Sequence, residues 1–170
     1  ASGAERESAL VDQDALALIQ FSSGTTVSPK PVALSHRQVL ANVRAILDHI
    51  PVDAGFKQSG VSWLPLYHDM GLIGCVFVAV VGPGPLVLLP PEQFLAKPAL
   101  WLRAIARHRA TVSPAPNFAF ALCTERIADE ELDGVDLSSW RLALSGAEPI
   151  AASCLREFNG RFERWGLRPQ

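Results

Sequence analysis

Short apolar runs separated by polar loops recur along this chain of 170 residues. The runs that have the length of buried strands are residues 16–21, 32–34, 61–64, 86–89, 111–113 and 140–144. Longer segments with apolar positions at helical spacing follow most of these runs. Because strand and helix patterns alternate, we predict an α/β fold with a mostly parallel sheet, right-handed crossovers and helices on both faces, in three α/β/α layers.

The predicted helices have recognisable ends. Ser35 and Gln38 form a capping box for the first helix, which stops at Pro51. Asn117 is expected to cap the helix that follows the fifth strand. The other predicted helices are residues 69–81, residues 98–110 and an amphipathic segment marked by Leu155, Phe158 and Phe162.

Residues 70–91 carry no charge and are long enough to cross a membrane. The sequence Gly-Pro-Gly-Pro at residues 82–85 divides this stretch into a helix-sized piece and a short strand. We therefore predict a fully buried helix followed by a central strand, and no integral membrane segment.

Composition favours a compact cytoplasmic domain. Hydrophobic residues make up 49% of the chain, charged residues make up 19% and the net charge is −2, so there is no basic stripe for nucleic acid. Cys75, Cys123 and Cys154 lie in apolar helical patterns, which suits buried, reduced thiols, and no metal-ligand spacing occurs. The polar residues 1–14 are predicted to be a flexible leader, and residues 15–170 the domain.

Three polar loops follow predicted strands. Residues 22–30 combine hydroxyl side chains, a glycine and Lys30, which suits a cradle for phosphates, although a Ser/Thr-rich hairpin turn explains the same composition. The second loop contains Tyr67, His68 and Asp69 and lies between a strand and the start of a helix, where the binding of an anion is favoured. The alternative interpretation is that Asp69 only caps the helix.

The third loop, residues 145–149, has small residues against which a flat ring could lie, although many loops between strands and helices contain glycine and proline. The alternating pattern places all three loops at strand ends on one edge of one sheet, which is where ligands bind in open α/β folds.

Together these loops resemble the adenylate-forming (acyl-activating, AMP-binding) superfamily, most closely its fatty acyl-AMP ligases and then long-chain acyl-CoA synthetases. Residues 22–32 resemble its phosphate loop, residues 63–72 (WLPLYHDMGL) its ligase histidine motif and residues 145–149 (SGAEP) its adenine-side motif. Residues 116–118 resemble the segment that helps to wall the acyl tunnel. The resemblance begins at Leu16 and implies an internal fragment, the central AMP-binding α/β subdomain.

The resemblance implies two-step chemistry. Such enzymes use ATP with Mg²⁺ to convert a fatty acid to an acyl-adenylate, releasing pyrophosphate. They then transfer the acyl group to a phosphopantetheine thiol, either on an acyl carrier protein of a polyketide or peptide assembly line or in coenzyme A. The implied role is therefore in lipid metabolism or polyketide biosynthesis.

The resemblance also assigns residues to ligands by matched position. His68, the implied catalytic residue, stands beside the fatty carboxylate. Substrate contacts are implied for Tyr67, Asp69, Met70, Pro116, Asn117 and Phe118. Nucleotide contacts are implied for Ser22, Ser23, Gly24, Thr25, Thr26, Ser28 and Lys30 on the phosphate side, and for Gly146, Ala147, Glu148 and Pro149 on the adenine side.

Two departures from the family pattern qualify that assignment. Val27 and Pro31 stand where the family usually has glycine, and losing a backbone donor to a phosphate costs roughly 1.5–3 kcal/mol. A degenerate, non-catalytic acyl- or nucleotide-binding module, or a purely structural domain, is the alternative. The expected ribose-binding aspartate, the main Mg²⁺ ligand and the C-terminal domain with its lysine have no match here, so we expect the isolated chain to be inactive.

Overall fold

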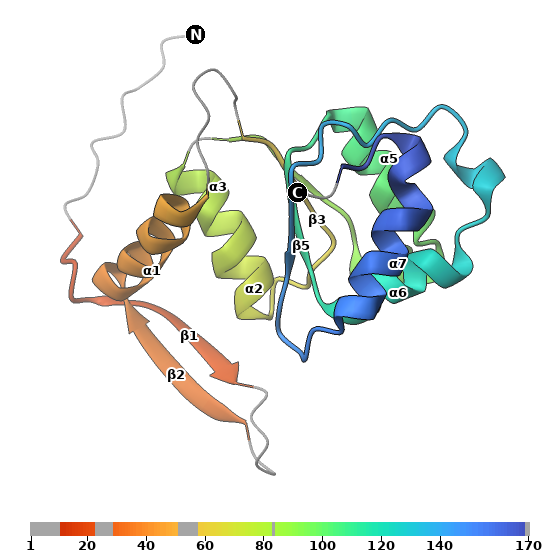
Figure 1. Cartoon of the computed structure of the whole chain (residues 1–170). Helices are drawn as coiled ribbons and strands as arrows, with labels where there is room; N and C mark the ends of the chain where they lie inside the picture. The colour runs from red at the N-terminus through yellow and green to blue at the C-terminus, as the bar shows by residue number, and fades with distance from the viewer. Residues whose placement is uncertain (1–10, 23–28, 51–57, 83, 169–170) are drawn as a thin grey trace, which may run out of the picture.

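The computed structural model describes residues 11–22, 29–50, 58–82 and 84–168 (Figure 1). Its strands are β1 (Leu16–Ser22), β2 (Lys30–Ser35), β3 (Gly60–Ser62), β4 (Leu86–Leu88), β5 (Val112–Ala115) and β6 (Leu142–Ser145). Its α-helices are α1 (His36–His49), α2 (Asp69–Gly71), α3 (Val78–Val81), α4 (Pro91–Ala96), α5 (Ala99–His108), α6 (Asn117–Arg126) and α7 (Ala152–Phe162). A π-helix, η1 (Leu72–Phe77), and two 3-10 turns, η2 (Asp129–Leu132) and η3 (Glu163–Trp165), complete the described elements.

Four strands form one parallel sheet in the order β4-β3-β5-β6. Helices α1, α2 and α3 lie on one side of this sheet, and α5, α6 and α7 lie on the other (Figure 1). This arrangement confirms the predicted α/β class with helices on both faces.

Strands β1 and β2 do not join that sheet. They pair with each other in antiparallel fashion and project as a separate hairpin (Figure 1). The prediction that all three polar loops follow strands of one sheet is therefore wrong. The connection between β1 and β2 is short, and a parallel crossover needs a dozen or more residues, so the two strands can only pair antiparallel.

The predicted helix 69–81 is present as the continuous series α2, η1 and α3. It is not fully buried, because Val80 is 74% exposed, and β4 lies at the edge of the described sheet instead of its centre. Within the described ranges, no helix is long and apolar enough to cross a membrane.

Two separate hydrophobic clusters hold the layers together. The larger cluster lies between the sheet and α5–α7, and its aromatic members include Trp63, which stacks on Phe94 at a centroid distance of 4.0 Å. The smaller cluster is formed by Val39 and Val43 of α1 and Ile73 of η1, and Leu18 and Leu34 of the hairpin pack against it. The hairpin is therefore held by packing that is independent of the main core.

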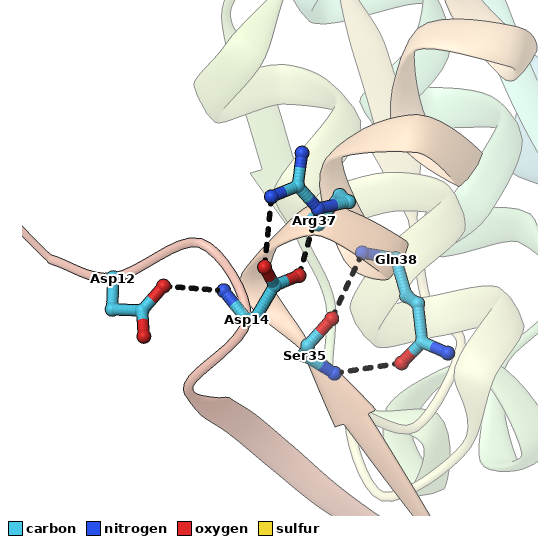
Figure 2. A network of polar contacts seen from close by, with 5 residues as sticks. All are labelled: Asp12, Asp14, Ser35, Arg37 and Gln38. Atoms are coloured by element: carbon cyan, nitrogen blue, oxygen red, sulfur yellow. Dashed lines mark hydrogen bonds and ion pairs between the residues drawn. The ribbon is translucent and has the colours of Figure 1, made fainter.

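The start of α1 is fixed by polar contacts (Figure 2). Ser35 and Gln38 form the predicted capping box, in which each side chain accepts a hydrogen bond from the other residue's backbone N–H. Arg37 makes two hydrogen bonds to the Asp14 carboxylate, at 2.7 and 2.9 Å, and the Arg37 guanidinium lowers the pKa of Asp14. The backbone N–H of Asp14 in turn donates to Asp12 Oδ1.

Candidate active site

His68 lies in the loop between β3 and α2, beyond the carboxyl end of β3. Its Nδ1 atom is 2.8 Å from Asp69 Oδ1. The backbone N–H of Met70 lies 2.8 Å from the same carboxylate oxygen and 3.2 Å from His68 Nδ1. The Met70 N–H thus donates to both side chains, and His68 Nδ1 is an acceptor at the cap position of the helix.

That assignment gives the imidazole a defined role. With Nδ1 accepting the Met70 N–H, the proton of neutral His68 lies on Nε2, which is then a hydrogen-bond donor. Asp69 also accepts the N–H of Met70 at the start of the helix. The two interpretations made from sequence, a helix cap and a ligand-facing histidine, are therefore compatible.

The second and third predicted loops meet in one cavity of about 690 Å³. His68, Asp69 and Met70 line it from the β3–α2 loop and the helix start, and Ala147 lines it from the loop after β6. The remaining lining residues come from β2, α1 and η1: Leu34, Gln38, Val39, Asn42, Ile46, Ile73 and Gly74.

Sequence reasoning missed Gln38 and Asn42 as site residues. They lie one helical turn apart on α1 and line the cavity with the apolar Val39 and Ile46. A pair of amide side chains at i and i+4, directly after the strand that follows the first polar loop, was the available signal.

The backbone of the third loop is strained at Ala147, whose φ of +68° lies in the left-handed region. A residue with a side chain costs roughly 1–2 kcal/mol there. The preceding Gly146 lies against Met70, since a Cβ atom added to Gly146 would be 3.9 Å from Met70 Sδ. This turn therefore brings the third loop against the helix that begins beside His68.

Glu148 and Asn117 join the third loop to the segment at residues 116–118. Glu148 Oε1 accepts a 2.6 Å hydrogen bond from the Phe118 N–H, in the first turn of α6. Asn117 Oδ1 accepts from the Ala151 N–H at 3.1 Å. The prediction that Asn117 caps α6 is therefore wrong: Pro116 occupies the cap position, and Glu148 supplies the acceptor from another segment. Pro149 is exposed, and Phe118 is 42% exposed.

The first predicted loop is described only at its two ends. Ser22 and Lys30 face each other in the β1–β2 ladder, and Ser23, Gly24, Thr25, Thr26, Val27 and Ser28 lie outside the described residues. Gln20 Nε2 donates to the backbone carbonyl of Tyr67 at 3.1 Å, which ties the hairpin to the His68 loop. The Tyr67 side chain is 84% exposed. A phosphate role for this loop stays a prediction.

A second, apolar cavity of about 300 Å³ adjoins the first. It lies between the sheet and the helices α1, η1 and α3, and residues such as Leu47, Val61, Val78 and Leu86 line it. Sequence reasoning placed an acyl wall at residues 116–118 and did not identify this space, because its lining comes from both sheet and helix residues far apart in the chain.

The cysteines and the acidic groups do not form a metal centre in the described part of the chain. Cys75 and Cys123 are buried and reduced, and burial raises the pKa of both thiols. Cys154 is half-buried, and burial also raises its pKa.

The chain is similar in sequence and structure to known proteins. The model of the AMP-binding enzyme family matches residues 2–168. A 4-hydroxyphenylalkanoate adenylyltransferase of Mycobacterium tuberculosis is 38% identical over 92% of this chain and 25% of its own length. A medium-chain-fatty-acid–[acyl-carrier-protein] ligase of Teredinibacter turnerae is 36% identical over 91% of this chain and 24% of its own length.

A solved structure shows the same fold. The fatty acyl-adenylate ligase from L. pneumophila, in complex with acyl adenylate and pyrophosphate, aligns with a TM-score of 0.86 and 37% identity over 93% of this chain and 28% of that chain. The present chain thus spans about a quarter of the length of the curated relatives that it matches.

Proposed function

This chain belongs to the AMP-binding enzyme family, and on that premise we propose that it is part of an ATP-dependent ligase that activates a fatty acid as an acyl-adenylate and releases pyrophosphate. The observation that carries the proposal is the cavity shared by His68 and Ala147, with an apolar cavity next to it. We call the first cavity the polar cavity because Gln38, Asn42, His68 and Asp69 lie in its otherwise apolar lining. A cavity with such polar groups that adjoins an apolar one suits a carboxylic acid with a long hydrocarbon chain.

The residues around the polar cavity fit a nucleotide and a carboxylate. Gly146 leaves room for a flat ring beside Met70, because a Cβ atom there would meet no other described atom within 4 Å. His68, whose Nδ1 accepts the Met70 N–H, presents Nε2 as the polar group that positions the acid. ATP bound there would supply the adenylyl group that activates the carboxylate, and Mg²⁺ would be held mainly by groups outside this chain.

For the second step we propose that the acyl group passes to the phosphopantetheine thiol of an acyl carrier protein, or to coenzyme A. The similarity to a fatty-acid–[acyl-carrier-protein] ligase supports the carrier protein. A cytoplasmic location and a role in lipid metabolism or polyketide biosynthesis stay predictions of the same resemblance.

Fatty-acid-dependent exchange of pyrophosphate into ATP by the parent protein tests the proposal. We expect exchange by the parent protein and none by the 170-residue chain alone, because groups outside this chain complete the site. A His68→Ala variant of the parent should lose exchange, whereas Arg103→Ala, on the opposite side of the sheet, should retain it. A parent protein that folds and binds ATP but exchanges with no carboxylic acid contradicts the proposal.

The alternative is a binding module that has kept the fold and lost the chemistry. Pro31 favours it, because proline has no N–H to offer a phosphate, and β2 accommodates it opposite Phe21 in the hairpin. Titration calorimetry of the parent with ATP and with a long-chain acyl-adenylate analogue separates the cases: the ligase binds both, a degenerate module binds only the acyl compound, and a structural domain binds neither. Restored exchange in the double variant Val27→Gly, Pro31→Gly would show that the loop alone is impaired.

A further inference from the structure

The polar and the apolar cavities meet at two residues. Ile46 of α1 and Gly74 of η1 line both spaces, and no other described residue does. A molecule with its carboxylate beside His68 and its hydrocarbon chain in the apolar cavity has to pass between these two residues. The width of that opening therefore depends on their side chains.

Gly74 contributes no side chain to the opening. A Cβ atom built there has open space around it, since the nearest described atom is Met70 Cγ at 4.0 Å. The backbone conformation at Gly74 does not require glycine either, because its φ is not positive. Glycine is also the least favourable residue in a helix after proline. Folding of the described chain thus gives no reason for glycine at this position.

Two neighbouring glycines show what a packing requirement looks like. A Cβ atom on Gly71 would lie 2.4 Å from the carbonyl oxygen of Pro65, and one on Gly82 would lie 2.4 Å from Leu47 Cδ2. Gly71 needs glycine because a backbone carbonyl occupies the space, whereas a side chain at Gly82 would require the Leu47 side chain to move. At Gly74 the space belongs to the cavities instead.

We infer that Gly74 is a specificity-determining residue: its missing side chain keeps the opening between the two cavities wide enough for the chain of a long, unbranched carboxylic acid. This inference rests on the proposed function, since it concerns which acids that ligase accepts. It also implies that a larger side chain at this one position restricts the accepted acids to those with shorter chains.

The test uses the full parent protein with Gly74→Ala and Gly74→Leu, assayed for acyl-adenylate formation with a series of acids from butyrate to palmitate. The matched controls are Gly160→Ala and Gly160→Leu, because Gly160 is also helical and has open space around its Cβ position, but lies exposed on α7. Thermal unfolding of every variant reports whether it remains folded.

We expect Gly74→Leu to lower kcat/KM for palmitate relative to butyrate by at least about tenfold, with a smaller change for Gly74→Ala. The Gly160 variants should keep the wild-type ratio. A folded Gly74→Leu protein with the wild-type ratio overturns the inference and leaves the proposed function intact. If Gly74→Leu fails to fold, the ratio in Gly74→Ala decides in the same way. If wild type forms no adenylate with any acid, both the inference and the proposed function are wrong.

Discussion

Replacement of Glu148 by alanine tests whether the third loop is fastened to helix α6 as the structure indicates. The Glu148 carboxylate accepts the N–H of Phe118, a donor in the first turn of α6 that has no partner within its own helix. Pro116, at the cap position, offers no side-chain acceptor. Glu148 therefore acts as the helix cap from a distant part of the sequence, and its negative charge is favourable at this end of the helix.

The expected loss follows from known helix caps. Replacing a capping side chain with alanine costs about 1 kcal/mol, and because Glu148 is exposed we expect no more than that. For a chain of this size, such a loss lowers the Tm by about 2–4 °C. Glu148→Gln keeps an acceptor oxygen without the charge, so we expect roughly half of the alanine effect.

Thermal and urea unfolding followed by circular dichroism measure these losses. Glu125→Ala is the matched control, because Glu125 is an exposed glutamate near the other end of the same helix. We expect it to unfold at or slightly above the wild-type temperature, since alanine is the better helix former. If Glu148→Ala and Glu125→Ala unfold together, Glu148 does not cap α6, and the link between the third loop and residues 116–118 is refuted.

Two further predictions concern the core and the thiols. Trp101→Phe removes the buried 2.8 Å hydrogen bond from Trp101 Nε1 to Ser113 Oγ and leaves unfilled space in the core. Urea unfolding should therefore show that the free energy of unfolding falls by about 2 kcal/mol. A fall of less than about 0.5 kcal/mol would contradict this hydrogen bond. Alkylation at mildly alkaline pH, followed by mass spectrometry, should modify the half-buried Cys154 before Cys75 and Cys123. Burial shields the Cys75 and Cys123 thiols from the reagent and also raises their pKa. Equal alkylation rates for the three thiols in the folded chain would contradict this packing.

Much of the fold could be predicted from local patterns. The capping box at Ser35 is where the sequence placed it, because both partners lie within four residues of each other. The helix of residues 98–110 was predicted from Trp101, Leu102 and Ile105, and all three are fully buried. Where a helix or strand is defined by its own periodicity, the sequence was sufficient.

The errors have a common physical origin in long-range pairing. The position of β4 at a sheet edge depends on which strands lie beside it, and nothing within its own apolar residues specifies that. Asn117 was expected to cap α6 from within the helix, whereas the Phe118 N–H is accepted by Glu148, thirty residues after Phe118 in the chain. The apolar cavity was missed for the same reason, because its walls combine α1, η1 and four strands.

The candidate site lies where separately packed parts of the molecule meet. Val39 and Ile73, which line the polar cavity, belong to the small cluster with the hairpin, whereas Ala147 follows β6 of the main sheet. The Gln20 amide joins the hairpin to the His68 loop through one side-chain hydrogen bond, an interaction that contributes about 1 kcal/mol. Substitutions in either core should therefore change the free energy of unfolding, whereas substitutions at such single bonds should change the shape of the cavity and leave the cores intact.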